Sequence, residues 1–100
     1  MINRYAKDVA RLMETVLTAA GATDRSTREA ASRGGALPPV LADYVAKVQL
    51  RSHRITNDDI ARLRTHGYSE DDIFEITVAA ALGKAFAGLD AALRAMETER

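Results

Sequence analysis

The sequence predicts an all-α fold, a single helical bundle of about five helices spanning residues 1–100. Apolar residues recur at intervals of three and four, and the segments that carry them begin or end at residues typical of helix caps. No segment alternates apolar and polar residues as a strand does, and no proline occurs after residue 39. With 47% hydrophobic residues and 28% charged residues, the chain matches an ordinary globular domain.

The N-terminal helix is expected over residues 1–20, with Gly21 ending it in a left-handed cap. Its apolar residues recur at helical spacing: Tyr5, Val9, Leu12, Met13, Val16, Leu17 and Ala20. Residues 22–36 form a weakly structured connection in this interpretation. Ser26 and Glu29 have capping-box spacing and Gly34-Gly35 marks a stop, but the segment is polar nearly all round. A short helix and a mobile link both remain open.

Residues 37–97 hold three further helices. Pro38 and Pro39 open the first of them, because proline is well tolerated in a first helical turn. Its buried stripe is expected to be Leu41, Tyr44, Val45 and Val48. Thr56 caps the next helix, which ends at His66-Gly67, and Ser69 caps the last one, which continues to Met96. A helix of about 27 residues is roughly 40 Å long.

The last helix carries a stripe of small residues, Ala79, Gly83, Ala87 and Ala91, at four-residue spacing. A glycine inside a helix costs about 1 kcal/mol relative to alanine, so its presence indicates close approach of another backbone. The partner is either the first or third helix of the same chain or the same helix of another subunit. Because a helix of this length exceeds what a compact domain of this size needs, we expect a homo-oligomer with this stripe at its interface.

Composition excludes several functions. The chain has no cysteine, which rules out disulfides, thiolate catalysis and thiolate metal sites. The net charge of zero provides no general attraction to nucleic acid or to anionic membranes. No apolar run approaches the roughly 18–20 residues of a membrane span, and the N-terminal segment lacks the apolar core of a signal peptide. We therefore expect a cytoplasmic protein that does not bind a membrane.

Titratable side chains offer weak candidates for catalysis, namely His53, Asp59 and His66. No H-x-x-x-H, H-x-H or E-x-x-H pattern is present, so the sequence predicts no metal site and no cofactor. The simpler interpretation is that His66 neutralises the C-terminal end of a helix and that the acidic residues after Ser69 neutralise an N-terminal end.

Two alternatives concern recognition of macromolecules. The segment DDIARLRTHGYSEDDIFEI reads as helix, turn and helix, and four arginines lie in or before it: Arg51, Arg54, Arg62 and Arg64. A DNA-recognition helix that opens with Glu70-Asp71-Asp72 would repel phosphates, so nucleic-acid binding is disfavoured. HGYSEDDI is also similar to the glycine-aromatic loop of ubiquitin-associated modules, but the long Ala-rich helix after it is unlike such a module.

The same residues carry a family resemblance. Ile60-Ala-Arg-Leu-Arg-Thr-His-Gly67, followed by Tyr-Ser-Glu-Asp-Asp-Ile-Phe-Glu75 and an Ala-rich helix, resembles the carboxymuconolactone decarboxylase and alkylhydroperoxidase D-like family over roughly residues 37–97. The resemblance implies an all-α homo-oligomer with long helices packed across subunits. The family's peroxidase motif, Glu-x-x-Cys-x-x-Cys-x-x-x-His, would fall on Gln49, Ser52, Ile55 and Asp59, none of which matches.

Without cysteine the thiol-dependent peroxidase mechanism is excluded. The resulting hypothesis is a divergent, non-catalytic structural, binding or accessory protein that forms homo-oligomers. The alternative is an acid–base enzyme, of decarboxylase or lactone type, that acts on a small organic acid bound at a subunit interface through His53, Asp59 and His66.

Overall fold

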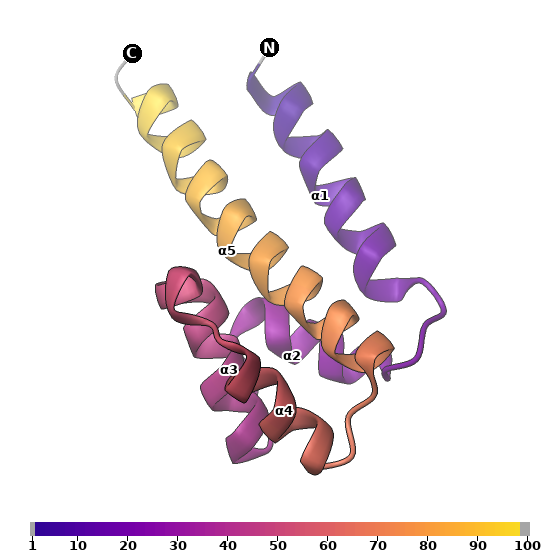
Figure 1. The fold of residues 1–100 in the computed structure, drawn as a ribbon. Coiled ribbons are helices and arrows are strands. Elements are labelled where there is room, and N and C mark those ends of the chain that lie inside the picture. The colour runs from indigo at the N-terminus through magenta and orange to yellow at the C-terminus, as the bar shows by residue number, and fades with distance from the viewer. Residues whose placement is uncertain (1, 99–100) are drawn as a thin grey trace.

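The computed structural model describes residues 2–98, and within that range it contains five α-helices, one 3₁₀ turn and no strand. The all-α prediction is confirmed, including the long last helix (Figure 1). The elements are α1 (Ile2–Thr18), α2 (Arg25–Arg33), α3 (Pro39–Arg51), η1 (Ser52–Arg54), α4 (Asn57–Thr65) and α5 (Glu70–Thr98).

Three predicted helix boundaries, at Gly34, Gly67 and Ser69, are confirmed by their capping geometry, and α5 continues to Thr98, past the predicted end at Met96. α2 ends at Gly34, which adopts the left-handed conformation at φ 75°, and Gly67 follows α4 at φ 96°. Such angles strain any residue with a Cβ, which explains glycine at both positions. At the start of α5 the Asp72 N–H donates to Ser69 Oγ at 3.0 Å, and the Ser69 N–H donates to the Asp72 carboxylate at 2.9 Å.

The connection between α1 and α2 differs from the prediction. α1 ends at Thr18, and Gly21 does not adopt a positive φ, so it is not a left-handed cap. Gly21 instead lies against the Glu75 carboxylate of α5, which a Cβ at this position would approach to 2.6 Å. The missing side chain therefore lets a residue from a distant part of the chain bind this connection.

α2 is the least anticipated part of the core. Residues 25–33 form a regular helix that packs across α5, so the helical alternative for this segment is correct (Figure 1). Its buried residues are Arg28, Ala31 and Ser32, none of them a large apolar residue. The predicted capping box is wrong, because the helix already begins at residue 25 and Glu29 pairs with Arg25 at 2.9 Å.

The core lies where α2, α3 and α4 surround the first half of α5. Its most buried large side chains are Leu17, Leu41, Leu63 and Ile76. α1 and the second half of α5 run side by side out of this body, and they form a two-helix arm (Figure 1). The molecule measures 51 × 29 × 20 Å with a radius of gyration of 14.9 Å. A compact 100-residue domain has a radius of about 13 Å, so the arm makes the fold elongated.

Candidate functional site

The three titratable candidates do not form a common site. His53 lies in the exposed turn η1, and His66 lies at the end of α4 with its Nδ1 2.8 Å from the Arg62 carbonyl oxygen. Asp59 pairs instead with Lys47 Nζ at 2.9 Å. No hydrogen bond joins any two of these three side chains, all of which lie within the described residues. The expected acid–base arrangement is therefore not assembled within one chain.

The environment of Asp59 favours its anion. The hydrogen bond from Lys47 lowers the pKa of this carboxyl below its ordinary value, and the Thr56 backbone N–H, which donates at 2.8 Å, lowers it further. Such a carboxylate is suited to capping α4 and to pairing with a cation rather than to proton transfer. Among residues 2–98 there is also no group of three His, Cys, Asp or Glu side chains placed to hold a metal ion.

Replacement of both histidines by alanine is expected to change little. Both side chains are exposed, and His66 makes one contact, from its Nδ1 to the Arg62 carbonyl oxygen of α4, which is worth about 1 kcal/mol at most for an ordinary hydrogen bond. In urea titrations, we expect the free energy of unfolding of a His53→Ala/His66→Ala variant to lie within about 1 kcal/mol of the parental value. A larger loss of stability would show that one of the two rings has a further structural partner.

The arginines that the sequence places in and before the helix–turn–helix segment do not form a uniformly positive surface. Arg64 pairs with Glu70 at 2.9 Å, while Arg51 and Arg62 line a hollow of about 230 Å³ between α3 and α4. The same hollow contains Asp43 and the Lys47–Asp59 pair. Both positive and negative side chains therefore line this hollow.

The small-residue stripe divides between two environments. Ala79 and Gly83 are buried within the chain, and a Cβ on Gly83 would lie 2.7 Å from both the carbonyl carbon and Cα of Ser32 in α2. The close backbone approach is real, but the partner at this point is α2 rather than another subunit or the first or third helix. Ala87 and Ala91 are exposed. The predicted interface is thus corrected for the first two residues and stays a prediction for the last two.

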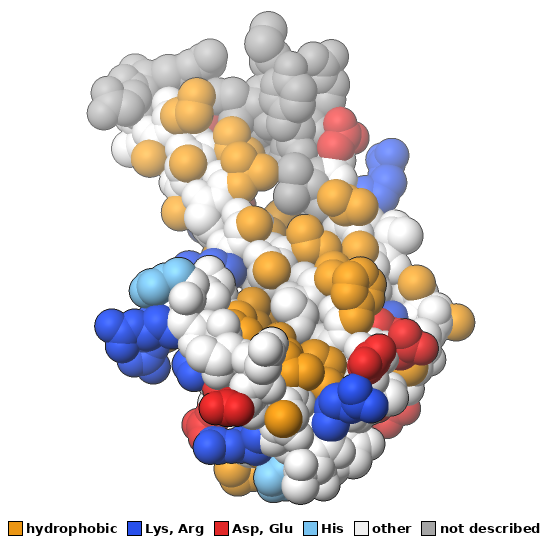
Figure 2. All heavy atoms as spheres, in the orientation of Figure 1, with side chains coloured by type: hydrophobic (Ala, Val, Ile, Leu, Met, Phe, Trp, Pro, Cys, Tyr) orange, Lys and Arg blue, Asp and Glu red, His pale blue; other side chains and the backbone are white. Residues whose placement is uncertain are grey.

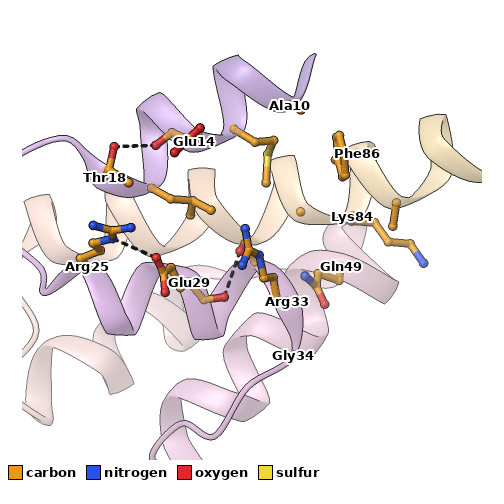
Figure 3. Close-up of a pocket in the computed structure, with 15 residues that line it drawn as sticks. Ala10, Glu14, Thr18, Arg25, Glu29, Arg33, Gly34, Gln49, Lys84 and Phe86 are labelled. Carbon is orange, nitrogen blue, oxygen red and sulfur yellow. Dashed lines mark hydrogen bonds and ion pairs between the residues drawn. The ribbon is translucent and has the colours of Figure 1, made fainter. Parts of the chain in front are cut away.

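A groove of about 730 Å³ lies between α1, α2 and α5, at the base of the arm (Figure 3). Its apolar side is formed by Met13 and Leu17 of α1 and by Gly83, Phe86 and Ala87 of α5. Charged and polar side chains complete its lining, half of them from α2: Glu14, Thr18, Arg25, Glu29, Ser32, Arg33, Gln49 and Lys84.

Gln49 reaches the groove from α3 and is held by two backbone carbonyls. Its Nε2 donates to Ala31 O of α2 at 3.2 Å and to Ala80 O of α5 at 3.0 Å. Both amide hydrogens are thereby used, and the Oε1 atom remains as an acceptor. Four-residue spacing from Leu41 and Val45 puts this polar residue in the buried stripe of α3, a signal that could have identified it from sequence. Nothing in the sequence distinguishes Arg33 or Phe86 as groove residues.

The distal half of α5 presents large apolar side chains beyond the body. We define the distal stripe as Phe86, Leu89, Leu93 and Met96, which follow one another at intervals of three and four residues. Leu89 is 37% exposed and Met96 54% exposed, and Leu12 on the neighbouring α1 is also 54% exposed. Figure 2 shows hydrophobic side chains continuing from the body along this part of the molecule.

Comparison of the chain with protein-family models, curated proteins and solved structures gives no match. The resemblance to the carboxymuconolactone decarboxylase and alkylhydroperoxidase D-like family therefore stays a prediction from the sequence pattern.

Proposed function

We propose that this protein is a homo-oligomeric binding or accessory protein whose copies associate through the distal stripe of α5 and the adjoining face of α1. The observation that carries the proposal is the exposure of large apolar side chains on an arm that extends from an otherwise packed body. We do not propose the acid–base alternative, because His53, Asp59 and His66 lie apart and Asp59 is held as an anion.

The spacing of the distal stripe supports helix pairing. Intervals of three and four residues are those of a coiled-coil seam, in which apolar side chains of one helix fit between those of the next. Ala85 and Ala92 flank the stripe and leave room for close approach. A single pair of antiparallel helices covers only one side of such a seam, as the exposure of Leu12, Leu89 and Met96 indicates.

A second arm would supply the missing cover. Two arms packed against each other make four helices, and four-helix bundles with this spacing are a stable arrangement. Burial of apolar surface contributes about 25 cal/mol per Å², so several half-exposed leucine, methionine and phenylalanine side chains provide a substantial driving force. The family resemblance implies the same type of assembly.

A membrane is the competing environment for this surface. The expectation that no segment is long and apolar enough for a membrane span is wrong, because by length and composition α5 could cross a bilayer, with a mean hydropathy of 1.5 over an 18-residue window. The first half of the same helix, however, contributes Ile73, Ile76, Ala79, Ala80 and Gly83 to the protein core. A helix that buries this face against α2 and α3 cannot also lie in lipid along its whole length, so we favour a second copy of this chain.

The test is a double substitution, Leu89→Glu/Leu93→Glu, measured by sedimentation velocity over a range of protein concentrations. Glutamate retains helix propensity but places charge in the seam, so we expect the variant to sediment as a monomer while the parent forms a defined multimer. Phe74→Glu is the matched control, because Phe74 is 69% exposed on the body half of the same helix.

The control should retain the parental mass, and circular dichroism should show the same helicity in all three proteins. An unchanged mass for the double variant would refute this interface. If the parent protein is a monomer and floats with phospholipid vesicles in a density gradient, the result would favour a membrane as the partner of this surface.

A further inference from the structure

We propose that the groove between α1, α2 and α5 binds an amphipathic monoanion, with the anionic group at Arg33 and the apolar body against Leu17, Met13 and Phe86. The groove is formed by a single chain, so this inference does not require the proposed assembly; the two proposals share only Phe86, which lies where the distal stripe meets the groove. Its volume of about 730 Å³ falls within the 300–1,000 Å³ that is usual for small-molecule sites.

The apolar side of the groove is already ordered. Leu17 is 2% exposed and Met13 8% exposed, so both are fixed by the core and form the floor of the groove, while Phe86 and Ala87 offer its more accessible apolar surface. Phe86 is half-buried and Ala87 is exposed, and the small side chain of Ala87 leaves space where a larger side chain would fill the groove. An aliphatic chain or an aromatic ring fits these contacts better than a polar molecule does.

The charge of the groove favours an anion. Three cations and two carboxylates line it, and one cation is neutralised because Arg25 Nε pairs with Glu29 at 2.9 Å. Within the described residues Arg33 forms no ion pair, and in Figure 3 its side chain extends from α2 toward the groove. A guanidinium binds a carboxylate or sulfonate through two parallel hydrogen bonds.

Other polar groups of the lining limit the ligand to a single charge. Lys84 Nζ points away from Arg33 in Figure 3, and Glu14 projects from α1, on the other wall. Gln49 donates both amide hydrogens to protein carbonyls, so it has no donor left for a second anionic group. A dianion would therefore gain little over a monoanion.

Two fluorescent probes with closely similar aromatic frameworks test the inference. 1-Anilinonaphthalene-8-sulfonate carries one negative charge, and N-phenyl-1-naphthylamine lacks it. We expect Arg33→Gln to weaken binding of the sulfonate about tenfold, as loss of a charge-assisted hydrogen bond does, and to change the affinity of the neutral probe by less than about twofold. Arg64→Gln is the control, because Arg64 pairs with Glu70 outside the groove and should bind both probes as the parent does.

A second variant keeps the test independent of Arg33. Ala87 is exposed and lines the groove, so Ala87→Glu should leave the fold intact, fill part of the groove and weaken both probes. Competition experiments test whether the head group must be an anion. Octanoate should displace the sulfonate probe at a lower concentration than octanol, which has the same chain length but no charge. Equal affinities of parent and Arg33→Gln for the sulfonate, or equal displacement by acid and alcohol, would overturn the proposal.

Discussion

Replacement of Gly83 by alanine is expected to destabilise the protein, although alanine is the better helix former. The added Cβ would lie 2.7 Å from two backbone atoms of Ser32 and closer still to its carbonyl oxygen, so α2 and α5 would have to separate. Overpacking of this kind costs about 1–3 kcal/mol, and α2 cannot retreat easily because Gln49 binds its backbone at Ala31.

Gly88 provides the matched control on the same helix. A Cβ at Gly88 meets nothing within 4 Å, so Gly88→Ala should stabilise the protein by up to about 1 kcal/mol through helix propensity alone. Thermal unfolding by circular dichroism compares the two, since 1 kcal/mol shifts the midpoint by roughly 4–8 °C in a domain of this size. Equal shifts for the two variants would contradict the close packing of α2 on α5.

Replacement of Glu75 by alanine should have a comparable effect by a different route. The Glu75 carboxylate accepts hydrogen bonds from the Ala22 N–H at 2.7 Å and from the Thr23 N–H and hydroxyl at 2.9 and 2.7 Å. Hydrogen bonds to a charged group contribute about 1.5–3 kcal/mol, so we expect a loss of that order in urea unfolding. The control is Glu70→Ala, which removes a carboxylate from an exposed ion pair and should cost less than about 1 kcal/mol.

The contribution of Glu75 should also depend on pH. The hydrogen bond from the Ala22 backbone, followed by those from Thr23, lowers the pKa of Glu75 below its ordinary value of 4.5. A lowered pKa in the folded state means that the stabilisation is complete above pH 4.5 and is lost as the pH falls through the folded value. The stability difference between the parent and Glu75→Gln should therefore shrink as the pH falls below this ordinary value. A difference that is constant down to acid pH would argue against an ionised Glu75.

Local signals in the sequence were sufficient for most of the fold. Gly34, Gly67 and the Ser69–Asp72 pair lie where helices begin and end, because each capping interaction depends on residues that are adjacent in sequence. The small residues at four-residue spacing along α5 correctly indicated a close backbone approach at Gly83.

The partner of α5 could not be derived in the same way. Large apolar residues are the usual signal of a buried helix, and the buried face of α2 consists of Arg28, Ala31 and Ser32. Short side chains are required there because the backbones of α2 and α5 approach so closely. The short side chains that allow α2 to pack closely on α5 therefore give no sequence signal of a buried helix.

The groove was missed for a related reason. Its lining comes from α1, α2, α3 and α5, and only the three-dimensional fold brings Met13, Arg33, Gln49 and Phe86 to one place. The candidates that the sequence did indicate, His53, Asp59 and His66, were selected by residue type; Asp59 caps α4 and pairs with Lys47 of α3, and the three do not meet. Residue type alone does not reveal which side chains meet.

The proposed assembly packs the exposed arm of one copy against that of another. Light scattering after size exclusion, at low and high salt, tests it most directly, because apolar association persists at high salt whereas association through surface charges weakens. We predict a defined multiple of the 10.8 kDa chain mass at both salt concentrations. A mass equal to that of a single chain at both would contradict the claim.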